Sequence, residues 1–497
     1  MLIHKSAQDF TQQELESLGI KGFCFDSQEA KKGDLFCCLP GVHTDGHKYI
    51  DHVRKMGIRH FLVNDASYER SNEIHILVSD TRQAMAVLAS IFYAVPSARL
   101  KVIGVTGTDG KSTATYLIQQ LLSALGHSCG MMSTINFKTD EKMRENLLRQ
   151  STPEAPQVEQ ALDEMVKNGM RYAVVESTSH GLSDRTARLS QIHFLAAVFT
   201  NVTIEHLEFH QTIEQYRHDK ANLFRQIGMH HLEDGFGVIN GRSEHSALYQ
   251  EACGDVPAYL YGVPGKDLWA ENIRPQISGT HFDLCCESGK KKVFLPLPGE
   301  FNIENVLAAI LCVSKLLKIS PLDLVPHVQD LKGAPGRMVV VMNEPFTVIV
   351  DYAHTPGSFE KILPQVKSTT EGKLIVVFGS GGERNLEKRP MQGELADRYA
   401  DVVVLTDEDP RLEDSQKILR DIATGVKNKK EGEDLFLIPS RREAFAKAFS
   451  LANPCDAVML LGKGHESCII IGNEKIPWNE EQVARDLLIE LGHVPQG

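Results

Sequence analysis

The sequence predicts an α/β protein with parallel sheets, divided into about three domains. Short runs rich in Val, Ile and Leu recur along the chain, each followed by a Gly-rich or polar loop and then by a segment of helical period. Such runs suit strands buried on both faces, as in parallel sheets with helical crossovers. A chain of 497 residues also exceeds the usual size of one domain, about 150 residues. The runs occupy residues 102–105, 173–176, 196–200, 348–351, 374–378, 402–405 and 457–461.

Two breaks in this pattern mark the expected domain boundaries. A helical pattern ends in Pro within residues 95–100, and a Gly/Pro-rich stretch covers 331–337. An apolar run follows each break, and glycine and proline interrupt regular elements. We therefore expect domains over residues 1–98, 99–331 and 332–497.

The composition is typical of an ordinary globular protein and excludes several classes of function. Lys and Arg number 53 against 65 Asp and Glu, a net charge of −12, which argues against a nucleic-acid partner. No apolar stretch is long enough for a membrane span, and the first residues lack the apolar core of a signal peptide. The ten cysteines lie mostly in apolar runs and form no CxxC pair. We expect a reduced, cytoplasmic protein without a membrane partner, and a monomer by default.

Residues 104–113 predict a phosphate-binding loop. They read Gly-Val-Thr-Gly-Thr-Asp-Gly-Lys-Ser-Thr, follow an apolar run and precede a segment with leucines on one helix face. Glycines let backbone N–H groups point at an anion, and a helix N-terminus adds positive charge. Lys111 would reach the β- and γ-phosphates, and the Ser112 hydroxyl would hold Mg²⁺. The first glycine of the strict motif is Val105 here and Gly107 serves instead, so the loop indicates a nucleoside triphosphate without specifying a reaction.

Carboxylates and histidines follow two neighbouring apolar runs. Glu176 ends one run, and the next run leads into residues 200–210, which contain His206 and His210. The carboxyl ends of parallel strands share one sheet edge, where ligands bind in open α/β sheets. Taken singly, each histidine is more typical of a hydrogen-bonded structural residue. Their recurrence at the edge that carries the phosphate loop favours a Mg²⁺ site.

These motifs together resemble those of the Mur ligase family. The resemblance implies a three-domain architecture with a central P-loop ATPase-like parallel sheet and a Rossmann-like C-terminal domain. It is closest to the branch of the family that adds the third residue of the peptidoglycan stem peptide. The matching segments are residues 25–27, 106–113, 176–182, 200–210, 299–305, 336–337, 351–356, 378–385, 388–390, 409–411 and 462–466.

The resemblance implies an ATP-dependent, ADP-forming acid–amino-acid ligase of peptidoglycan precursor synthesis. Its substrates would be UDP-N-acetylmuramoyl-L-alanyl-D-glutamate, a free diamino acid and ATP, with Mg²⁺ as cofactor. ATP would phosphorylate the D-glutamate carboxylate, and an amine of the diamino acid would attack the acyl phosphate. The carboxylate and the γ-phosphate are both anionic, so cations and loop amides must screen their repulsion.

The family motifs also imply roles for individual residues. Lys220, alone typical of a solvated helix lysine, would be carbamylated and would bind Mg²⁺ together with Ser112, Glu176 and His206. The catalytic residues would be Lys111, Lys220 and His206. The ATP site would comprise Gly107, Thr108, Asp109, Gly110, Lys111, Ser112, Thr113, Asn302 and Arg337. The UDP-sugar dipeptide site would comprise Phe25, Ser27, Val42, His43, Thr44, Gln150, Ser151, Thr152, Thr178 and Arg188. The diamino-acid site would comprise Arg384, Glu408, Asp409, Pro410, Arg411, Gly462 and Glu466.

Two departures from the family pattern bear on function. Asp109 replaces an asparagine of the phosphate loop, so its carboxylate must point away from phosphate or pair with a cation. Asp409 stands where the diaminopimelate enzymes carry asparagine, and it would repel the distal carboxylate of diaminopimelate and attract the ammonium of lysine or ornithine. Arg384 and Arg411 remain as a clamp for that carboxylate. We therefore favour meso-diaminopimelate, and L-lysine and ornithine stay open.

Two other functions compete with this assignment. Another amide ligase of the superfamily, such as folylpolyglutamate synthetase or the enzyme that adds D-Ala-D-Ala, is opposed by Asp-Pro-Arg at 409–411 and Gly-Lys-Gly-His-Glu at 462–466. A non-catalytic nucleotide-binding paralogue is opposed by the presence of Lys111, Glu176, His206 and Lys220.

Overall fold

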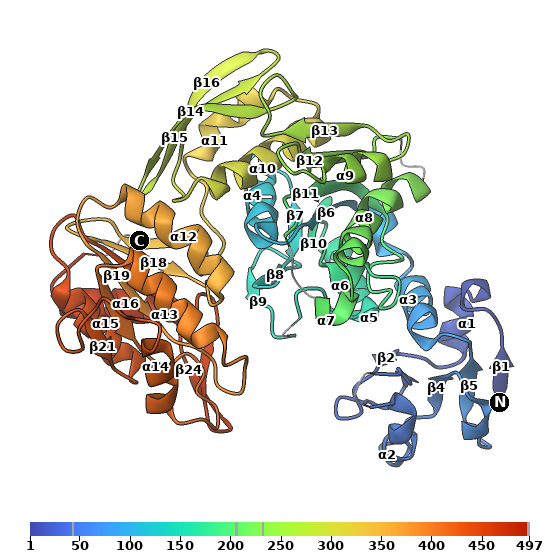
Figure 1. Cartoon of the computed structure of the whole chain (residues 1–497). Coiled ribbons are helices and arrows are strands. Elements are labelled where there is room, and N and C mark those ends of the chain that lie inside the picture. The colour runs from blue at the N-terminus through green and yellow to red at the C-terminus, as the bar shows by residue number, and fades with distance from the viewer. Residues whose placement is uncertain (42–43, 149, 204–206, 231–232, 495–497) are drawn as a thin grey trace. The chain divides into compact units, whose positions relative to one another are not determined.

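The protein is described by a computed structural model that covers residues 1–41, 44–148, 150–203, 207–230 and 233–494 (Figure 1). The chain packs into two compact units, Met1–Asp267 with Ala308–Lys318, and Leu268–Leu307 with Ile319–Gly497. Helix α10 (Phe301–Leu317) contributes residues to both. The three domain ranges expected from the sequence stay a prediction.

The first unit begins with a parallel sheet of five strands in the order β1-β5-β4-β3-β2. Successive side chains of a strand point to opposite faces, so Cys37 packs with the residues of α1 and α3, and Cys38 with those of α2. The strands are β1 (Leu2–His4), β2 (Gly22–Cys24), β3 (Asp34–Cys37), β4 (His60–Val63) and β5 (Ile74–Leu77). The helices are η1 (Ala7–Asp9), α1 (Gln12–Ser17), η2 (Gly46–Tyr49), α2 (Ile50–Lys55), η3 (Ala66–Tyr68), α3 (Thr81–Phe92) and η4 (Pro96–Arg99).

The same unit contains an eight-stranded sheet in the order β13-β12-β11-β6-β10-β7-β8-β9, parallel except for β8 and β9. The strands are β6 (Lys101–Thr106), β7 (Cys129–Met132), β8 (Asn136–Lys138), β9 (Arg144–Glu145), β10 (Tyr172–Glu176), β11 (Phe194–Phe199), β12 (Phe236–Asn240) and β13 (Ala258–Tyr261). The helices are α4 (Lys111–Ala124), α5 (Ala155–Lys167), α6 (Ser179–Leu182), α7 (Leu207–His210), α8 (Ile213–Met229) and α9 (Ser246–Ala252).

Strand β6 lies inside this sheet, and helices cover it on both faces. Figure 1 shows α4 and α8 on opposite sides of these strands. Gly104 permits the close approach of α8, because a Cβ there would lie 2.4 Å from Leu223 Cδ1. The segment between β6 and α4 is therefore held at the carboxyl edge of the sheet, where ligands bind in open α/β sheets.

The second unit joins a small antiparallel sheet to a six-stranded sheet. The antiparallel sheet consists of β14 (Trp269–Gln276), β15 (Gly279–Cys286) and β16 (Gly289–Leu295), and the short helices η5 (Pro321–Leu324) and α11 (Val325–Val328) follow α10. The six strands have the order β17-β18-β22-β19-β20-β21, and only β17 runs antiparallel to its neighbour. They are β17 (Val339–Met342), β18 (Thr347–Asp351), β19 (Leu374–Phe378), β20 (Val402–Leu405), β21 (Leu435–Leu437) and β22 (Ala457–Leu461).

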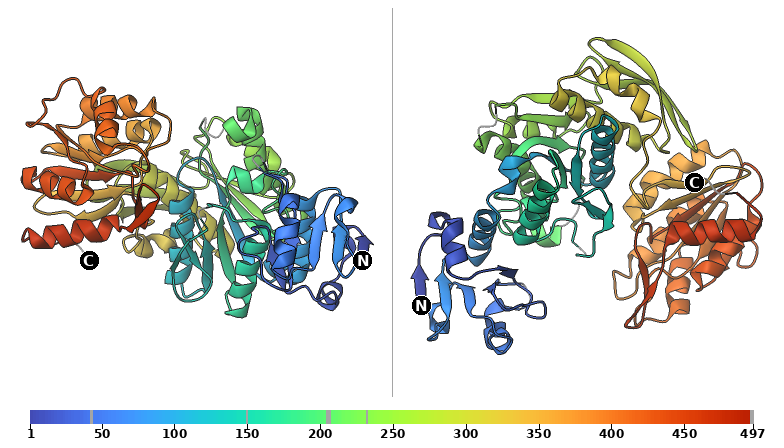
Figure 2. Two further views of the ribbon diagram at one scale, coloured as in Figure 1. Left: turned by 90° about the horizontal axis from the view of Figure 1, so that it is seen from below. Right: turned by 180° about the vertical axis from the view of Figure 1, so that it is seen from behind.

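Five helices cover the two faces of the six-stranded sheet. Val376 and Met459 pack against α12, α13 and α14, whereas Val377 and Leu460 pack against α15 and α16. Figure 2 shows the orange and the red helices on opposite sides of this sheet. The remaining elements are α12 (Pro356–Thr369), α13 (Lys388–Tyr399), α14 (Ser415–Ala423), α15 (Arg441–Leu451), β23 (Cys468–Ile471), β24 (Glu474–Pro477) and α16 (Glu480–Glu490).

The predicted fold class is confirmed, since all seven apolar runs form strands of parallel sheets. The antiparallel sheet β14–β16 and the hairpins β8–β9 and β23–β24 were not predicted. Within the described residues, no single helix has the length and apolar composition of a membrane span. One pair, Phe301–Leu317 with Pro321–Val328, meets these two criteria only jointly and bends by 115° at its break.

Candidate functional site

The predicted phosphate loop lies between β6 and α4, and two of its glycines adopt conformations that other residues rarely take. Gly107 has φ 152°, and a Cβ at this position would lie 1.9 Å from Thr200 Oγ1. Gly110 has φ 79° in the left-handed region and caps the N-terminus of α4. Both glycines let the backbone turn sharply into the helix, as a phosphate cradle requires.

The end of strand β11 holds the loop in shape. Thr108 N donates to Asn201 O at 2.8 Å, and Asp109 N donates to Asn201 Oδ1 at 3.0 Å. Thr200 Oγ1 donates to Asp109 O at 2.6 Å. Asp109 itself is exposed, so the carboxylate that departs from the family pattern lies on the solvent side of the loop.

Ser112 and Glu176 meet at the base of this loop. Ser112 Oγ donates to Glu176 Oε2 at 2.9 Å, and Thr134 donates to both carboxylate oxygens of Glu176 through its N–H and its hydroxyl, each at 2.8 Å. Glu176 is 3 % exposed. Lys111 Nζ bends back over the loop and donates to Thr108 O at 2.7 Å. Two predicted Mg²⁺ ligands are therefore adjacent, and a cation lies over the loop.

Helix α8 brings Lys220 to the other side of the loop. Lys220 is 1 % exposed, and its Nζ donates to Gly107 O at 2.6 Å. One turn earlier, Tyr216 places its hydroxyl 3.0 Å from Thr108 Oγ1 and its ring 4.3 Å from Lys220 Nζ. Lys220 is therefore buried against the phosphate loop, and its interpretation as a solvated helix lysine is wrong.

The residues around the loop provide donors that suit Mg²⁺. The cation prefers hard oxygen ligands and usually takes one or two from the protein, with phosphates and water completing its coordination. Ser112 and Glu176 supply a hydroxyl and a carboxylate within one hydrogen bond of each other. In the described part of the chain, no group of three or more His, Cys, Asp and Glu residues forms a metal site by itself. His206, the other predicted ligand, lies outside the described residues.

The predicted dipeptide contacts of the first unit lie beside Glu176. Thr178 donates to Thr152 Oγ1 through its N–H and its hydroxyl, and Thr152 Oγ1 donates to the backbone oxygen of Glu176 at 3.1 Å. Arg188 donates to Thr152 O at 2.9 Å and to Glu154 Oε1 at 2.7 Å. Gln150 and Ser151 precede this cluster in the chain, and Gln150 is exposed.

The predicted uridine-nucleotide residues lie in the N-terminal sheet region. Phe25 and Ser27 follow β2 and are half-buried, and Thr44 is exposed with its hydroxyl 3.4 Å from Tyr49 OH. Val42 and His43 lie outside the described residues.

The predicted diamino-acid residues gather at the carboxyl edge of the six-stranded sheet. The loops after β19 and β20 are joined by a hydrogen bond from Gly382 N to Asp409 O at 2.8 Å. Arg384, on the first loop, is exposed. Arg411, on the second, has φ 53°, and its Nε is buried without a hydrogen-bond partner among the described residues. Such backbone strain is typical of binding sites.

Asp409 is paired with a lysine that was not assigned a role from the sequence. Asp409 Oδ1 accepts from Lys463 Nζ and from Ile470 N, each at 2.9 Å. Lys463 is 1 % exposed and also donates to Glu466 Oε2 at 2.5 Å. The negative charge at position 409 is thus offset within the protein.

Glu408 is an acid whose charge state is sensitive near neutral pH. Burial raises the pKa of Glu408 to about 7, although Lys388 and Lys463 favour its charged form. Its Oε2 is buried without a hydrogen-bond partner in the described structure. Gly462 keeps room beside this oxygen, because a Cβ there would lie 3.2 Å from Glu408 Oε2. Glu408 Oε2 could therefore accept a hydrogen bond from a ligand donor such as an ammonium group.

The two residues predicted to face the nucleotide from the second unit are both engaged locally. Arg337 lies over the ring of Tyr352, 4.5 Å from its centroid. Asn302 is 3 % exposed, and its Nδ2 donates to Pro298 O at 2.7 Å. Burial, reinforced by the charge of Arg337, lowers the pKa of the neighbouring His465 to about 3, so this imidazole is neutral at physiological pH.

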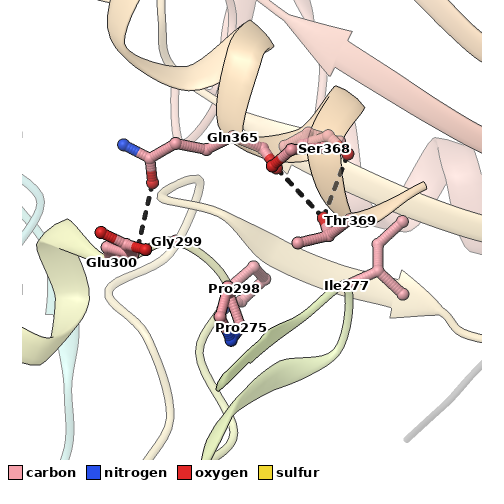
Figure 3. A pocket seen from close by; sticks show the side chains of 9 residues that line it. Pro275, Ile277, Pro298, Gly299, Glu300, Gln365, Ser368 and Thr369 are labelled. Atoms are coloured by element: carbon pink, nitrogen blue, oxygen red, sulfur yellow. Dashed lines mark hydrogen bonds between the residues drawn. The ribbon is translucent and has the colours of Figure 1, made fainter. Parts of the chain in front are cut away.

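A small cavity lies beside the segment that leads into α10, lined by residues of β14, this segment and α12 (Figure 3). Gln365 Oε1 accepts from Glu300 N across it at 3.0 Å. Its volume is about 30 Å³, and none of the predicted site residues lines it.

Four residues that shape the site had no assigned role in the sequence analysis: Thr134, Asn201, Tyr216 and Lys463. Asn201 and Lys463 belong to motifs quoted there, and Tyr216 precedes Lys220 by one helical turn. Nothing in the sequence marks Thr134, because its role depends on where β7 ends beside β10.

The chain matches three family descriptions. They are "Mur ligase family, catalytic domain" over residues 6–93, "Mur ligase middle domain" over 105–313 and "Mur ligase, glutamate ligase domain" over 336–464.

Similar proteins extend over nearly the whole chain. It is 42% identical to the UDP-N-acetylmuramyl-tripeptide synthetase of Treponema denticola, over 96% of this chain and 93% of that protein. It is 34% identical to the UDP-N-acetylmuramoyl-L-alanyl-D-glutamate–2,6-diaminopimelate ligase of Clostridium botulinum, over 94% and 95%. A solved structure of a ligase with the latter name superposes with a TM-score of 0.68 at 28% identity, covering 98% of this chain and all of the other. The chain therefore belongs to the Mur ligase family, as an ATP-dependent acid–amino-acid ligase of the MurE type.

Proposed function

We propose that the protein joins a diamino acid to UDP-N-acetylmuramoyl-L-alanyl-D-glutamate, with ATP converted to ADP and phosphate. The D-glutamate carboxylate attacks the γ-phosphorus and ADP leaves. The amine then attacks the acyl carbon, phosphate leaves, and the nitrogen loses a proton. The observation that carries the proposal is the convergence of Lys111, Ser112, Glu176 and Lys220 on one phosphate loop, in a chain similar throughout to tripeptide synthetases.

The residues of the loop have distinct tasks in this reaction. The amides of the loop and the N-terminus of α4 bind the phosphates, and Lys111, released from Thr108 O, offsets charge on the β- and γ-phosphates. Ser112 and Glu176 would hold Mg²⁺, which supplies further charge neutralisation at the phosphates when bound. Thr134 orients Glu176 through two hydrogen bonds.

We propose that Lys220 acts as a carbamate, converted from a cation to an anion that can bind Mg²⁺, with His206 as a further ligand. Its burial against Gly107 O supports this role, because the side chain already ends at the loop that would carry the phosphates. The reaction would run in the cytoplasm on a monomer.

For the amino acid, we propose meso-diaminopimelate, with L-lysine or ornithine as the second candidate. Two observations support the first. Arg384 and Arg411 lie on loops joined by a hydrogen bond, and Lys463 offsets the charge of Asp409 that would repel a distal carboxylate. The acidic groups Glu408 and Glu466 favour the second, because lysine and ornithine carry an ammonium without a carboxylate.

A substrate panel tests the proposal. ADP release is measured with UDP-N-acetylmuramoyl-L-alanyl-D-glutamate plus meso-diaminopimelate, L-lysine or ornithine, and with each component omitted. Release that requires both the nucleotide-sugar and one diamino acid is expected. ADP release with a folate substrate or with D-Ala-D-Ala instead would show that the protein is another amide ligase of the superfamily. No release with any acceptor would favour a non-catalytic nucleotide-binding paralogue.

A further inference from the structure

A serine, a histidine and an aspartate lie in hydrogen-bonded series beside the phosphate loop. His210 Nδ1 lies 2.8 Å from Asp219 Oδ2, and His210 Nε2 lies 3.0 Å from Ser179 Oγ. A carboxylate only accepts, so His210 Nδ1 donates to Asp219 Oδ2. Asp219 Oδ1 accepts from Gln215 Nε2 at 2.7 Å, which fixes the carboxylate from its other side.

This series has the connectivity of a hydrolase triad but not its exposure. Ser179, His210 and Asp219 are 2%, 1% and 1% exposed, and the rings of Phe209, His180 and Tyr216 pack around the imidazole. A nucleophilic serine must reach a substrate carbonyl and needs oxyanion donors beside it. Burial from solvent removes that access, so the series holds chain segments together.

The segments that it holds carry the chemistry of the proposed reaction. Ser179 begins α6, three residues after Glu176, and Asp219 directly precedes Lys220 on α8. His210 ends α7, four residues after His206 in the sequence. A second hydrogen bond, from Asn222 Nδ2 to Leu182 O at 3.0 Å, also joins α8 to α6. One imidazole therefore links the segments that carry Glu176 and Lys220.

We propose that His210 is a positioning residue for the ligase reaction. It fixes α8 against the N-terminus of α6, so that Glu176 and Lys220 face the phosphate loop from opposite sides at a constant separation. This inference rests on the proposed function, because the two residues that it aligns are the proposed Mg²⁺ ligands. Hydrogen-bond partners behind metal ligands contribute to affinity and rate in this way.

The test compares variants that break one or both links. His210→Phe keeps an aromatic ring and removes both hydrogen bonds, whereas His210→Asn keeps a donor at the position of Nδ1 for Asp219. Ser97→Ala is the matched control, because it removes a buried hydrogen bond that Ser97 Oγ accepts from His193 N at 3.2 Å. This bond lies at the amino end of β11, at the edge of the sheet opposite the phosphate loop. The readouts are kcat and KM for each substrate, Mn²⁺ binding in the presence of ADP by electron paramagnetic resonance, and thermal unfolding.

For His210→Phe we expect kcat to fall about 100-fold, with KM values within about threefold of wild type and Mn²⁺ affinity about 10-fold weaker. His210→Asn should retain part of the kcat and of the Mn²⁺ affinity. Ser97→Ala should lower the unfolding temperature without changing kcat or Mn²⁺ affinity. Wild-type kcat and Mn²⁺ affinity in His210→Phe would overturn the proposal. If that variant does not fold, His210→Asn decides, and a kcat and Mn²⁺ affinity equal to those of Ser97→Ala would overturn the proposal. A wild-type enzyme that binds Mn²⁺ and ADP but ligates no diamino acid would instead refute the proposed function.

Discussion

Lys463 Nζ donates to Asp409 Oδ1 at 2.9 Å, and the pair is shielded from solvent, with side-chain exposures of 1% and 14%. Burial alone lowers the pKa of Lys463, but Glu466 and Asp409 outweigh it and raise the pKa above its usual value. The aspartate that departs from the diaminopimelate pattern is therefore held as half of an ion pair. The charge that an amino acid meets here depends on Lys463 as much as on Asp409.

Removing the cation should destabilise the second unit. Lys463→Met leaves Asp409 and Glu466 facing each other without a counter-charge, and breaking a buried pair costs about 3 kcal/mol. Denaturant unfolding should show a loss of that size. Lys463→Met combined with Asp409→Asn should recover part of it. Identical stabilities of the single and double variants would contradict this account, because the uncompensated charge of Asp409 would then cost nothing.

Changing Asp409 should shift the choice of amino acid. Asp409→Asn keeps an acceptor for Ile470 N and Lys463 Nζ and removes the negative charge that offsets Lys463. The net charge near Lys463 then becomes more positive and favours a distal carboxylate. We expect kcat/KM for meso-diaminopimelate to rise about 10-fold relative to L-lysine. A tenfold change corresponds to about 1.4 kcal/mol, the size expected for one charge contact. An unchanged ratio in competition assays would show that position 409 does not sense that carboxylate.

Glu159 should make stability depend on pH. Its carboxyl group is 1% exposed on α5, and neither oxygen has a hydrogen-bond partner in the described structure, although Ser90 lies close enough to favour the charged form slightly. Burial raises its pKa from 4.5 to about 8. Because the folded state holds this proton more tightly, its stabilising contribution is complete below pH 4.5 and is lost as the pH rises through about 8.

Glu159→Gln should remove this dependence. Between pH 4.5 and pH 9 the wild-type free energy of unfolding should lose about 3–5 kcal/mol through this group. Urea titrations at the two pH values should therefore show a decrease in the free energy of unfolding that is smaller for Glu159→Gln than for wild type, by about 3–5 kcal/mol. Parallel pH profiles of wild type and variant would contradict the assignment of a neutral buried acid.

Lys220 should be essential for turnover. Lys220→Ala removes the proposed carbamate, and added bicarbonate should not restore activity because no amine remains at this position. Lys220→Arg keeps a cation beside Gly107 O and cannot take the carbamate role, so it should be equally inactive. The measurement is ADP release by wild type and both variants at raised bicarbonate. An active Lys220→Arg enzyme would refute the carbamate role.

Much of the fold and the position of the site were predictable because they depend on local patterns. The strand β6, its loop and α4 are contiguous, so spacing alone placed Lys111 and Ser112. Glu176 was predictable because parallel strands end at one sheet edge. The antiparallel sheet β14–β16 was not predictable, because β14 and β16 carry polar residues at their exposed positions and contain no continuous apolar run.

The contacts that tune the site depend on tertiary structure and escaped prediction. Thr134 binds Glu176 only because β7 ends next to β10, and Asp409 meets Lys463 across 54 residues of sequence. The sequence showed a negative charge at position 409 but not the cation beside it. For the same reason His210, marked only as one of several histidines, showed no sign of its link to Ser179.

The most direct test of this account is ADP release by the purified enzyme in the presence of ATP and Mg²⁺, measured with and without each acceptor. The account predicts release only when UDP-N-acetylmuramoyl-L-alanyl-D-glutamate and a diamino acid are both present, with meso-diaminopimelate the best amine and one tripeptide product formed per ADP. Release that does not depend on the amine, or none with any diamino acid, would contradict it.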